Sequence, residues 1–408
     1  IGAGTQNVAV SGNVYNYAQM NVISPITLAN QRIGGTAIQA LSVTNGAATG
    51  LYSEKLDATI TASSSPIIAS GSAISGLAAG ATNNSNFTVG VDTATAGAKS
   101  GIAAIRLVSN GTGTSGLANT TLAAQNVTVS GNVYRTASGS TAATVNLGAQ
   151  HVGGLASQAL TVSNNSINDS YSEKLDAIFG TATGAISTSG IASLIGAGSN
   201  STAMSVGVNT TSAGAKTGNV SVNFSSDGTG TSGLATIGAG TQNVAVSGNV
   251  YNYANAGLQH LSGGNWNGTG LTLDFGTFTQ GSGTQTSIFN LANSGLDSTY
   301  TDLLDGKYTF SLGSAFSSSN VSNFRNLAGG SSITNLGFLF DTRVVGNYIG
   351  HILLAVNGHN ASGFNADLSS LDITFKGSVS AVPLPTSVWL FLAGMMGLLG
   401  LGHRKKII

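Results

Sequence analysis

The segment IGAGTQNVAVSGNVYNYA occurs twice in this chain, as residues 1–18 and, letter for letter, as residues 237–254. A diverged third copy, QNVTVSGNVY, covers residues 125–134. The offsets are 119 residues from Gln6 to Gln125 and 117 residues from Gln125 to Gln242. A period near 118 residues is too long for a solenoid repeat of about 20–50 residues and fits a whole β-sandwich domain of roughly 100 residues.

Other blocks keep the same register. YSEKLDA stands at 52–58 and again at 171–177, and NGTGTSGL at 110–117 is matched by DGTGTSGL at 227–234. In the C-terminal half, LDITFKGSVSAV (371–382) parallels the VAVSGNVY strand that closes the other units. These blocks indicate tandem duplication with a third, diverged unit.

The register predicts five parts. They are a terminal strand of a truncated preceding repeat (1–18), a first sandwich repeat (19–136), a second (137–254), a diverged third sandwich domain (255–382) and a C-terminal segment (383–408). Without the rest of its repeat, the strand at 1–18 has an unpaired edge, so we expect it to be frayed or irregularly paired.

Short segments with alternating apolar and polar residues are bounded by Gly, Asn, Ser and Asp throughout the chain. Alternation with period two and many β-branched residues favour strands, and Gly-rich turns at regular spacing favour sandwiches. The predicted fold is therefore all-β: tandem immunoglobulin-like β-sandwiches followed by one short C-terminal transmembrane helix. A parallel β-helix is the alternative, and the long period disfavours it.

Composition excludes several functions. Charged residues make up 7% of the chain and the net charge is zero, so no basic patch is available for nucleic acid. The sequence has no cysteine, which excludes disulfides, thiol catalysis and thiolate metal sites.

The C-terminal segment reads VPLPTSVWLFLAGMMGLLGLGHRKK from Val382 to Lys406. Two prolines precede an apolar run of 17 residues, 386–402, that would span about 25 Å as a helix, the short end for a bilayer crossing. The alternative is a buried C-terminal helix of the third domain.

This segment strongly resembles the PEP-CTERM sorting signal, with Leu384 where the namesake motif has Glu. The resemblance implies export, transient anchoring in the inner membrane, cleavage by an exosortase-type processing enzyme and association with exopolysaccharide. It also assigns residues. The sorting motif is Val382, Pro383, Leu384 and Pro385; the membrane segment includes Val388, Trp389, Leu390, Phe391, Gly394, Gly397 and Leu401; the basic stop is Arg404, Lys405 and Lys406.

The repeats resemble choice-of-anchor D domains, which are related to Hydin-type immunoglobulin-like sandwiches. The residues that carry this likeness are LDFG at 273–276, the turns at 96–101 and 213–218, and the strand ends Asn45, Asn164 and Asn293.

No constellation of catalytic or metal-binding residues emerges. The five histidines, His151, His260, His351, His359 and His403, have no metal-pair spacing and are predicted to be surface residues. Glu54 and Asp57, three apart in the duplicated SEKLDA motif, suggest acid–base chemistry; because the motif is repeated with Lys55 or Lys174 inside it, a solvated loop with a local ion pair is preferred. Asp92 and Asp227 lie in turns, but acidic residues are too sparse for a calcium site. No cofactor is expected.

The sequence therefore predicts a non-enzymatic, exported surface or matrix protein, tethered before processing and associated with exopolysaccharide or with like subunits. An adhesin or a carbohydrate- or ice-binding module is the alternative. A hydrolase in the third domain, using Trp266, Asp302, Asp305 and His351, is a third hypothesis.

Overall fold

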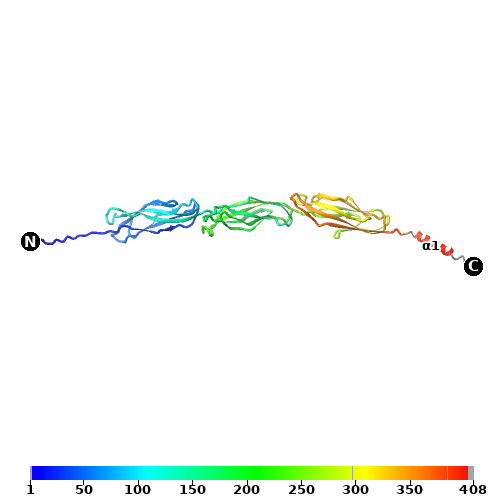
Figure 1. Cartoon of the computed structure of the whole chain (residues 1–408), viewed down its shortest axis with the longest axis horizontal. Coiled ribbons are helices and arrows are strands. Elements are labelled where there is room, and N and C mark those ends of the chain that lie inside the picture. The colour runs from blue at the N-terminus through cyan, green and yellow to red at the C-terminus, as the bar shows by residue number, and fades with distance from the viewer. Residues whose placement is uncertain (1, 296, 384, 403–408) are drawn as a thin grey trace. The chain divides into compact units, whose positions relative to one another are not determined.

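The computed structural model describes residues 2–295, 297–383 and 385–402. Figure 1 shows strands along almost all of this length and one helix, α1, close to the C-terminus. The chain divides into two compact units: residues up to 145 with 157–207 and 218–246, and residues 146–156 and 208–217 with those from 247 onward.

The first sandwich packs a sheet of order β1-β4-β8-β6 against a sheet of order β2-β11-β9-β5-β7, with β3 beside β11 and β10 beside β9. β11 runs parallel to β2 and antiparallel to β9. The strands are β1 (Met20–Val22), β2 (Ile26–Thr27), β3 (Gln31–Arg32), β4 (Ile38–Asn45), β5 (Lys55–Ser63), β6 (Ile67–Gly71), β7 (Ile74–Leu77), β8 (Thr82–Val91), β9 (Gly97–Asn110), β10 (Thr120–Thr121) and β11 (Gln125–Tyr134).

The second sandwich has sheets of order β12-β14-β18-β16 and β13-β20-β19-β15-β17. Its strands are β12 (Gly139–Thr141), β13 (Thr144–His151), β14 (Ser157–Asn164), β15 (Lys174–Gly184), β16 (Ile186–Ser189), β17 (Ala192–Ile195), β18 (Asn200–Val208), β19 (Gly214–Asp227) and β20 (Ile237–Tyr251).

The third sandwich repeats this plan with sheets of order β21-β24-β28-β26 and β22-β23-β31-β29-β25-β27, and β30 beside β29. β31 lies parallel to β23 and antiparallel to β29, the place that β11 has in the first sandwich. Its strands are β21 (Ala256–Ser262), β22 (Asn265–Asn267), β23 (Thr272–Thr279), β24 (Gln285–Asn293), β25 (Leu303–Ser311), β26 (Phe316–Ser319), β27 (Phe324–Leu327), β28 (Ser332–Phe340), β29 (Gly346–His359), β30 (Asn365–Asp367) and β31 (Leu371–Ser380).

Alternation of buried and exposed positions places one face of each strand in a core. In β11 the side chains of Val127, Val129 and Val133 are fully buried, while Thr128 between them faces out. The core of the first sandwich is mostly aliphatic around one phenylalanine, Phe87. The all-β sandwich fold predicted from the alternation is thus confirmed.

The segment before the first sandwich forms no strand over residues 2–15, and Asn16 joins Ser53 through an isolated parallel bridge. Its valines are open to solvent: Val8, Val10 and Val14 are 81%, 91% and 90% exposed.

The predicted C-terminal helix is present as α1 (Thr386–Gly402). Its side chains from 386 to 399 are exposed apart from half-buried Val388, so the alternative of a buried helix is wrong. In the part of the chain that the structure describes, however, no helix has the length and apolarity needed to cross a membrane. The prediction of a transmembrane helix is therefore not supported: α1 has 17 residues, about 25 Å of helix against roughly 30 Å of hydrocarbon.

Candidate functional site at the ends of the sandwiches

The segment that precedes each sandwich contacts it through the same pair of backbone hydrogen bonds. Asn16 donates its backbone N–H to the Tyr52 carbonyl (2.8 Å), and its own carbonyl accepts from the N–H of Glu54 (3.0 Å). The same two bonds join Arg135 to Tyr171 and Glu173, and Asn252 to Tyr300 and Asp302. A tyrosine pair flanks each contact, with ring centroids 5.5 to 5.7 Å apart: Tyr15 with Tyr52, Tyr134 with Tyr171, and Tyr251 with Tyr300.

A buried asparagine fixes this end of each sandwich. The Asn164 side chain is 1% exposed. Its Nδ2 donates to the carbonyls of Glu173 and Ile195 (both 3.1 Å), and its Oδ1 accepts from the N–H groups of Ser138 and Ser166 (both 3.2 Å). Asn45 makes the same four bonds, and Asn293 makes three of them. All hydrogen-bonding capacity of the Asn164 amide is used, so the backbone of the acidic residue Glu173 is held firmly.

The acidic residue held in this way is buried in every sandwich. Glu54, Glu173 and Asp302 are 2%, 0% and 0% exposed, and we call them the entrance carboxylates. The prediction of a solvated loop with an ion pair to Lys55 or Lys174 is therefore wrong. The reason is that each of these residues directly precedes a strand, β5, β15 or β25, and its side chain lies within the end of the sandwich instead of in water.

Glu173 binds a cation from the first sandwich. Arg32 Nε donates to its Oε2 at 2.9 Å, and the hydroxyls of Ser226 (2.6 Å, to Oε2) and Ser232 (to Oε1) also donate to it. Arg32 further donates through Nη2 to the Ala235 carbonyl (2.7 Å), and Asn30 donates to the Ser232 carbonyl (2.8 Å). A buried carboxylate needs a partner of this kind, because its desolvation is otherwise uncompensated.

Asp302 binds a histidine in the same position. His151 Nε2 lies 2.8 Å from Asp302 Oδ2, and Asn360 Nδ2 donates to the other oxygen at 2.7 Å. The imidazole stacks on Tyr253 (centroids 4.2 Å apart, planes 6° apart) and meets Phe364 at the same distance. His151 is therefore not the surface residue that the sequence predicts; its side chain is 12% exposed.

Arg32 and His151, 119 residues apart, occupy equivalent places, and we call them the exit residues. Each precedes a residue whose N–H bonds the last strand of its own sandwich: Ile33 to Tyr134 and Val152 to Tyr251, both at 2.9 Å. In the third sandwich the corresponding bond runs from Gln280 to Ser380 (2.8 Å), so the exit position is Thr279, which carries no charge.

Glu54 differs from its two counterparts. The hydroxyls of Ser109 (2.6 Å) and Ser115 (2.5 Å) donate to it, as the two serines do to Glu173. Among the described residues, however, no Lys, Arg or His forms a salt bridge with it.

A second ion pair, Arg135 with Asp169, lies where the chain passes from the first sandwich to the second. Partial desolvation tends to raise the pKa of Asp169, but hydrogen bonds from Tyr171, Arg135 and Ser172 outweigh it and hold that pKa below its usual range. Arg135 Nη1 lies 2.5 Å from Asp169 Oδ2.

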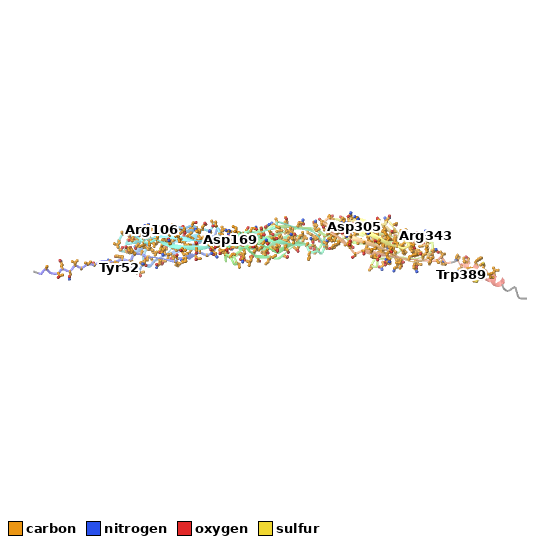
Figure 2. The ribbon with its side chains drawn as sticks, in the orientation of Figure 1. Tyr52, Arg106, Asp169, Asp305, Arg343 and Trp389 are labelled. Atoms are coloured by element: carbon orange, nitrogen blue, oxygen red, sulfur yellow. The ribbon has the colours of Figure 1, made fainter. Side chains whose placement is uncertain are left out.

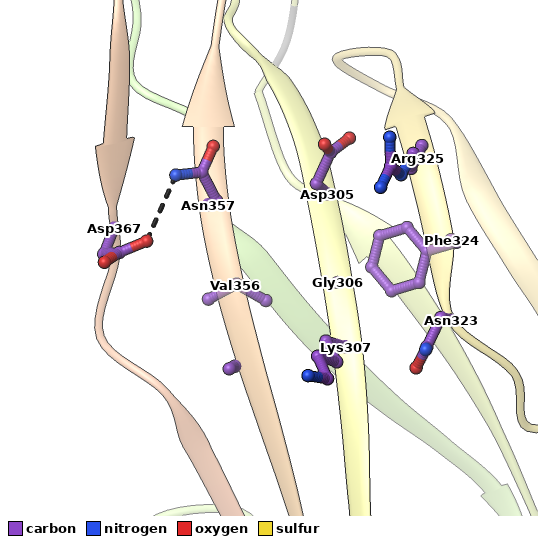
Figure 3. A pocket seen from close by; sticks show the side chains of 10 residues that line it. Asp305, Gly306, Lys307, Asn323, Phe324, Arg325, Val356, Asn357 and Asp367 are labelled. Atoms are coloured by element: carbon purple, nitrogen blue, oxygen red, sulfur yellow. Dashed lines mark hydrogen bonds between the residues drawn. The ribbon is translucent and has the colours of Figure 1, made fainter.

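A groove recurs on the larger sheet. It has a volume of about 410 Å³ in the first sandwich, beside Asp57 and Arg106, and about 320 Å³ in the third, beside Asp305. Figure 3 shows the third-sandwich groove between Asp305 and Lys307 on β25, Phe324 and Arg325 on β27, and Asp367 near Asn357. The aspartate has a structural task, because Asp57, Asp176 and Asp305 each accept a backbone N–H, from Gly76, Leu194 and Asn326 respectively, at 2.6 to 2.7 Å. Each of those three residues has a positive φ.

The residues proposed for a hydrolase are not brought together. Asp302 pairs with His151, Asp305 with His359 (3.2 Å), and His351 with Asp372 (3.5 Å). Trp266 packs edge-on against Phe289 in the core. Within the described ranges, no group of three or more His, Asp or Glu residues is arranged to hold a metal ion.

The residues of the predicted sorting signal lie after the last strand. Val382, Pro383 and Pro385 are exposed, and β31 ends before them at Ser380. On α1, Trp389 (Figure 2), Leu390 and Phe391 are 65%, 71% and 67% exposed, and Gly394 and Gly397 face open space. Val388 is half-buried, and Leu401 belongs to the last turn. Leu384, Arg404, Lys405 and Lys406 lie outside the described residues.

No family model matches the chain, and no curated protein matches it. Several solved structures show weak likeness. The human desmocollin-1 ectodomain is 9% identical over 90% of this chain and 62% of its own (TM-score 0.34), and mouse protocadherin-24 EC1-3 is 10% identical over 93% and 100% (TM-score 0.34). The enterotoxigenic E. coli adhesin CfaE is 11% identical over 59% of this chain and 98% of its own (TM-score 0.27). Likenesses at this level carry no argument about function.

Proposed function

We propose that this chain is a non-catalytic, exported surface or matrix protein, in which the sandwiches form a spacer with ordered joints and the C-terminal segment is a sorting signal. The repeated joint is the observation that carries this proposal. Only 7% of the residues are charged, yet buried carboxylates with a basic partner recur at the joints, as Glu173 with Arg32 and Asp302 with His151. A spacer needs defined joints between its modules more than it needs a catalytic pocket.

The C-terminal segment supports the sorting part of the proposal. α1 keeps large apolar side chains such as Trp389 and Phe391 in solvent, and Pro383 and Pro385 separate it from the last strand. A soluble sandwich gains nothing from such a helix, since exposed apolar surface normally marks an interaction site. We assign it to recognition by an exosortase-type processing enzyme during transient contact with the inner membrane. The processed protein then meets exopolysaccharide or like subunits at the surface.

The test is the intact mass of the protein from surface and membrane fractions of a host that has an exosortase-type enzyme, with an isogenic host lacking it as control. We expect a surface species ending near Val382–Pro385 in the first host alone. A surface species that retains residues 388–402 in both hosts would contradict sorting by cleavage and would leave the spacer part untouched.

A carbohydrate-binding adhesin is the second candidate, and the groove of the third sandwich favours it. Lys307, Arg325 and Asp367 line the groove beside an aromatic ring, in a chain where charge is scarce. Titration of purified exopolysaccharide by calorimetry tests it. Binding that is lost in Arg325→Ala and kept in Arg106→Ala, an arginine that lines the first-sandwich groove from a different strand, would establish this function.

A further inference from the structure

Glu54, at the end of the first sandwich, is a buried carboxylate with no cationic partner among the described residues. The carboxylate is 2% exposed, two serine hydroxyls donate to it, and the Asn45 amide holds its backbone carbonyl at 3.1 Å. Hydroxyl donors alone compensate a buried carboxylate poorly. The equivalent Glu173 and Asp302 each have a further partner, the exit residue: the Arg32 guanidinium for Glu173 and the His151 imidazole for Asp302.

The two loops that carry the serine donors differ in how far their side chains are exposed to solvent. NGTGTSGL (110–117) and DGTGTSGL (227–234) differ at one position. In the second loop Ser232 is 3% exposed, its carbonyl accepts from Asn30, and Leu234 is half-buried. In the first loop Ser115 is half-buried and Leu117 is 63% exposed. The first loop therefore closely matches the second in sequence, but it is exposed as expected for a loop that no neighbouring sandwich covers.

The residues just before the first sandwich already make the contacts that precede the other two sandwiches. Asn16 makes the two backbone bonds that Arg135 and Asn252 make at the other joints, and Tyr15 pairs with Tyr52. Residues 2–15 ahead of it have the sequence of β20, the strand that closes the second sandwich, but they form no strand and leave their valines exposed. Because this linker site is taken by the chain itself, a second copy cannot reach Glu54 by the same path.

We propose that Glu54 is the docking site for a guanidinium or imidazolium group on a further sandwich repeat, one whose closing strand is formed by residues 2–15. The cation occupies the position that Arg32 and His151 occupy at the other two joints. Docking gives the buried carboxylate a cationic partner and covers the 110–117 loop. It also places residues 2–15 in the closing strand of the docked repeat, which buries their exposed valines.

An extended chain tests the proposal. Residues 137–236 are placed directly ahead of residue 1 of the full chain, which recreates the sequence of the second repeat, 137–254, without a foreign residue. Arg replaces the added copy of His151, so that the new joint offers Glu54 the guanidinium that Glu173 receives from Arg32. Hydrogen exchange of the 111–117 amides, whose sequence context occurs once in the extended chain, is then compared between the extended and the original chain.

We expect exchange in the 111–117 loop to slow by about tenfold relative to the original chain, because a contact pair in one network couples at this level. Glu54→Gln in the extended chain, and Gln in place of the added Arg, should each restore fast exchange while the amides of β9 and β11 stay protected. Unchanged exchange in the extended chain would overturn the proposal, as would slowing that survives both Gln variants. Slowing in the original chain that grows with protein concentration would identify a second copy as the occupant and would also overturn it.

Discussion

The first and third sandwiches share one strand order and differ at both ends. At the entrance, Asp302 is paired with His151, whereas the side chain of Glu54 has, within the described part of the chain, only serine donors. At the exit, the first sandwich presents Arg32 to Glu173, whereas the third has the uncharged Thr279. The fold therefore does not depend on the joint chemistry. The end residues differ instead: the first sandwich has Arg32 at its exit position, and the third has the uncharged Thr279 there.

The cores of these two sandwiches differ as well. The third core contains Phe275, Phe289, Phe316, Phe338, Phe340 and Phe375, whereas the first relies on Val, Ile and Leu around Phe87. Rings from the two sheets meet directly in the third, as between Phe338 and Phe375 at 4.9 Å. The same topology thus accepts two packing solutions of similar pattern, as expected when volume and patterning are kept.

Removing the buried asparagine should have the largest effect and should affect the two sandwiches alike. Asn293→Ala and Asn45→Ala each leave buried backbone donors and acceptors without partners, which we expect to cost about 4 kcal/mol of local stability. Native-state hydrogen exchange at β29 and β9 measures each sandwich separately. Asn347→Ala, at an exposed asparagine of β29, is the control and should change little. A loss in only one sandwich would mean that the asparagine is not a common element of the fold.

Replacing Arg32, the exit residue of the first sandwich, tests the difference between the exits of the first and third sandwiches. Arg32→Met leaves the buried Glu173 carboxylate without its cation, and we expect about 3 kcal/mol of lost stability at that joint. Adding Glu173→Gln should recover most of it, since the loss comes from an uncompensated charge. Arg106→Met, at an exposed arginine of the same sandwich, is the control. Thermal unfolding followed by calorimetry measures all four proteins, and an equal loss in Arg106→Met would contradict the assignment.

The repeats made much of the fold predictable. Strand alternation predicts the all-β sandwich fold, and the segment LDITFKGSVSAV, which parallels VAVSGNVY in sequence, forms β31 in the place that β11 has in the first sandwich. Asn45, Asn164 and Asn293 stand out in the sequence, although nothing local shows that their amides hold a backbone end. That role depends on the neighbouring strand ends, which only the fold brings together.

The joints could not be predicted, because their contacts join distant positions. Arg32 and Glu173 are 141 residues apart and His151 and Asp302 are 151 apart. Lys55, adjacent in sequence to Glu54, was the natural partner to expect. One signal was available: Arg32 and His151 recur at the same offset as the SEKLDA motif, and a basic residue repeated in register with a carboxylate indicates a pair.

Residues 1–18 and 237–254 show most directly that context outweighs local sequence. Val246 is 1% exposed in β20, and Val10, its identical counterpart, is 91% exposed. Val246→Thr should cost about 2 kcal/mol, because a hydroxyl replaces a methyl of the same shape in the core, whereas Val10→Thr should change stability by less than about 0.5 kcal/mol. Chemical denaturation of the two variants measures both, and equal losses would show that residues 2–15 are packed in solution.

Tyr308 gives the smallest difference between the first and third sandwiches. It stands on β25 where Ile60 stands on β5, opposite Leu354 and Ile105 respectively. Its hydroxyl is buried and has no hydrogen-bond partner among the residues that the structure describes, and burial raises its pKa to about 12. Tyr308→Phe removes the unsatisfied group, so we expect a gain of about 1 kcal/mol in the third sandwich at neutral pH.

The pH dependence of this variant tests the cause. A phenol whose pKa is raised in the folded state keeps its proton while the unfolded chain, with a pKa near 10, loses it. The stabilising contribution is therefore complete below about pH 10 and is lost as the pH rises through about 12. Exchange-derived stability of β29 should fall over this range in the parent chain and fall less in Tyr308→Phe, while that of β9 should respond equally in both. An identical alkaline fall in the two proteins would mean that water reaches the Tyr308 hydroxyl, and the aromatic core of the third sandwich would then be less tightly closed than the aliphatic core of the first.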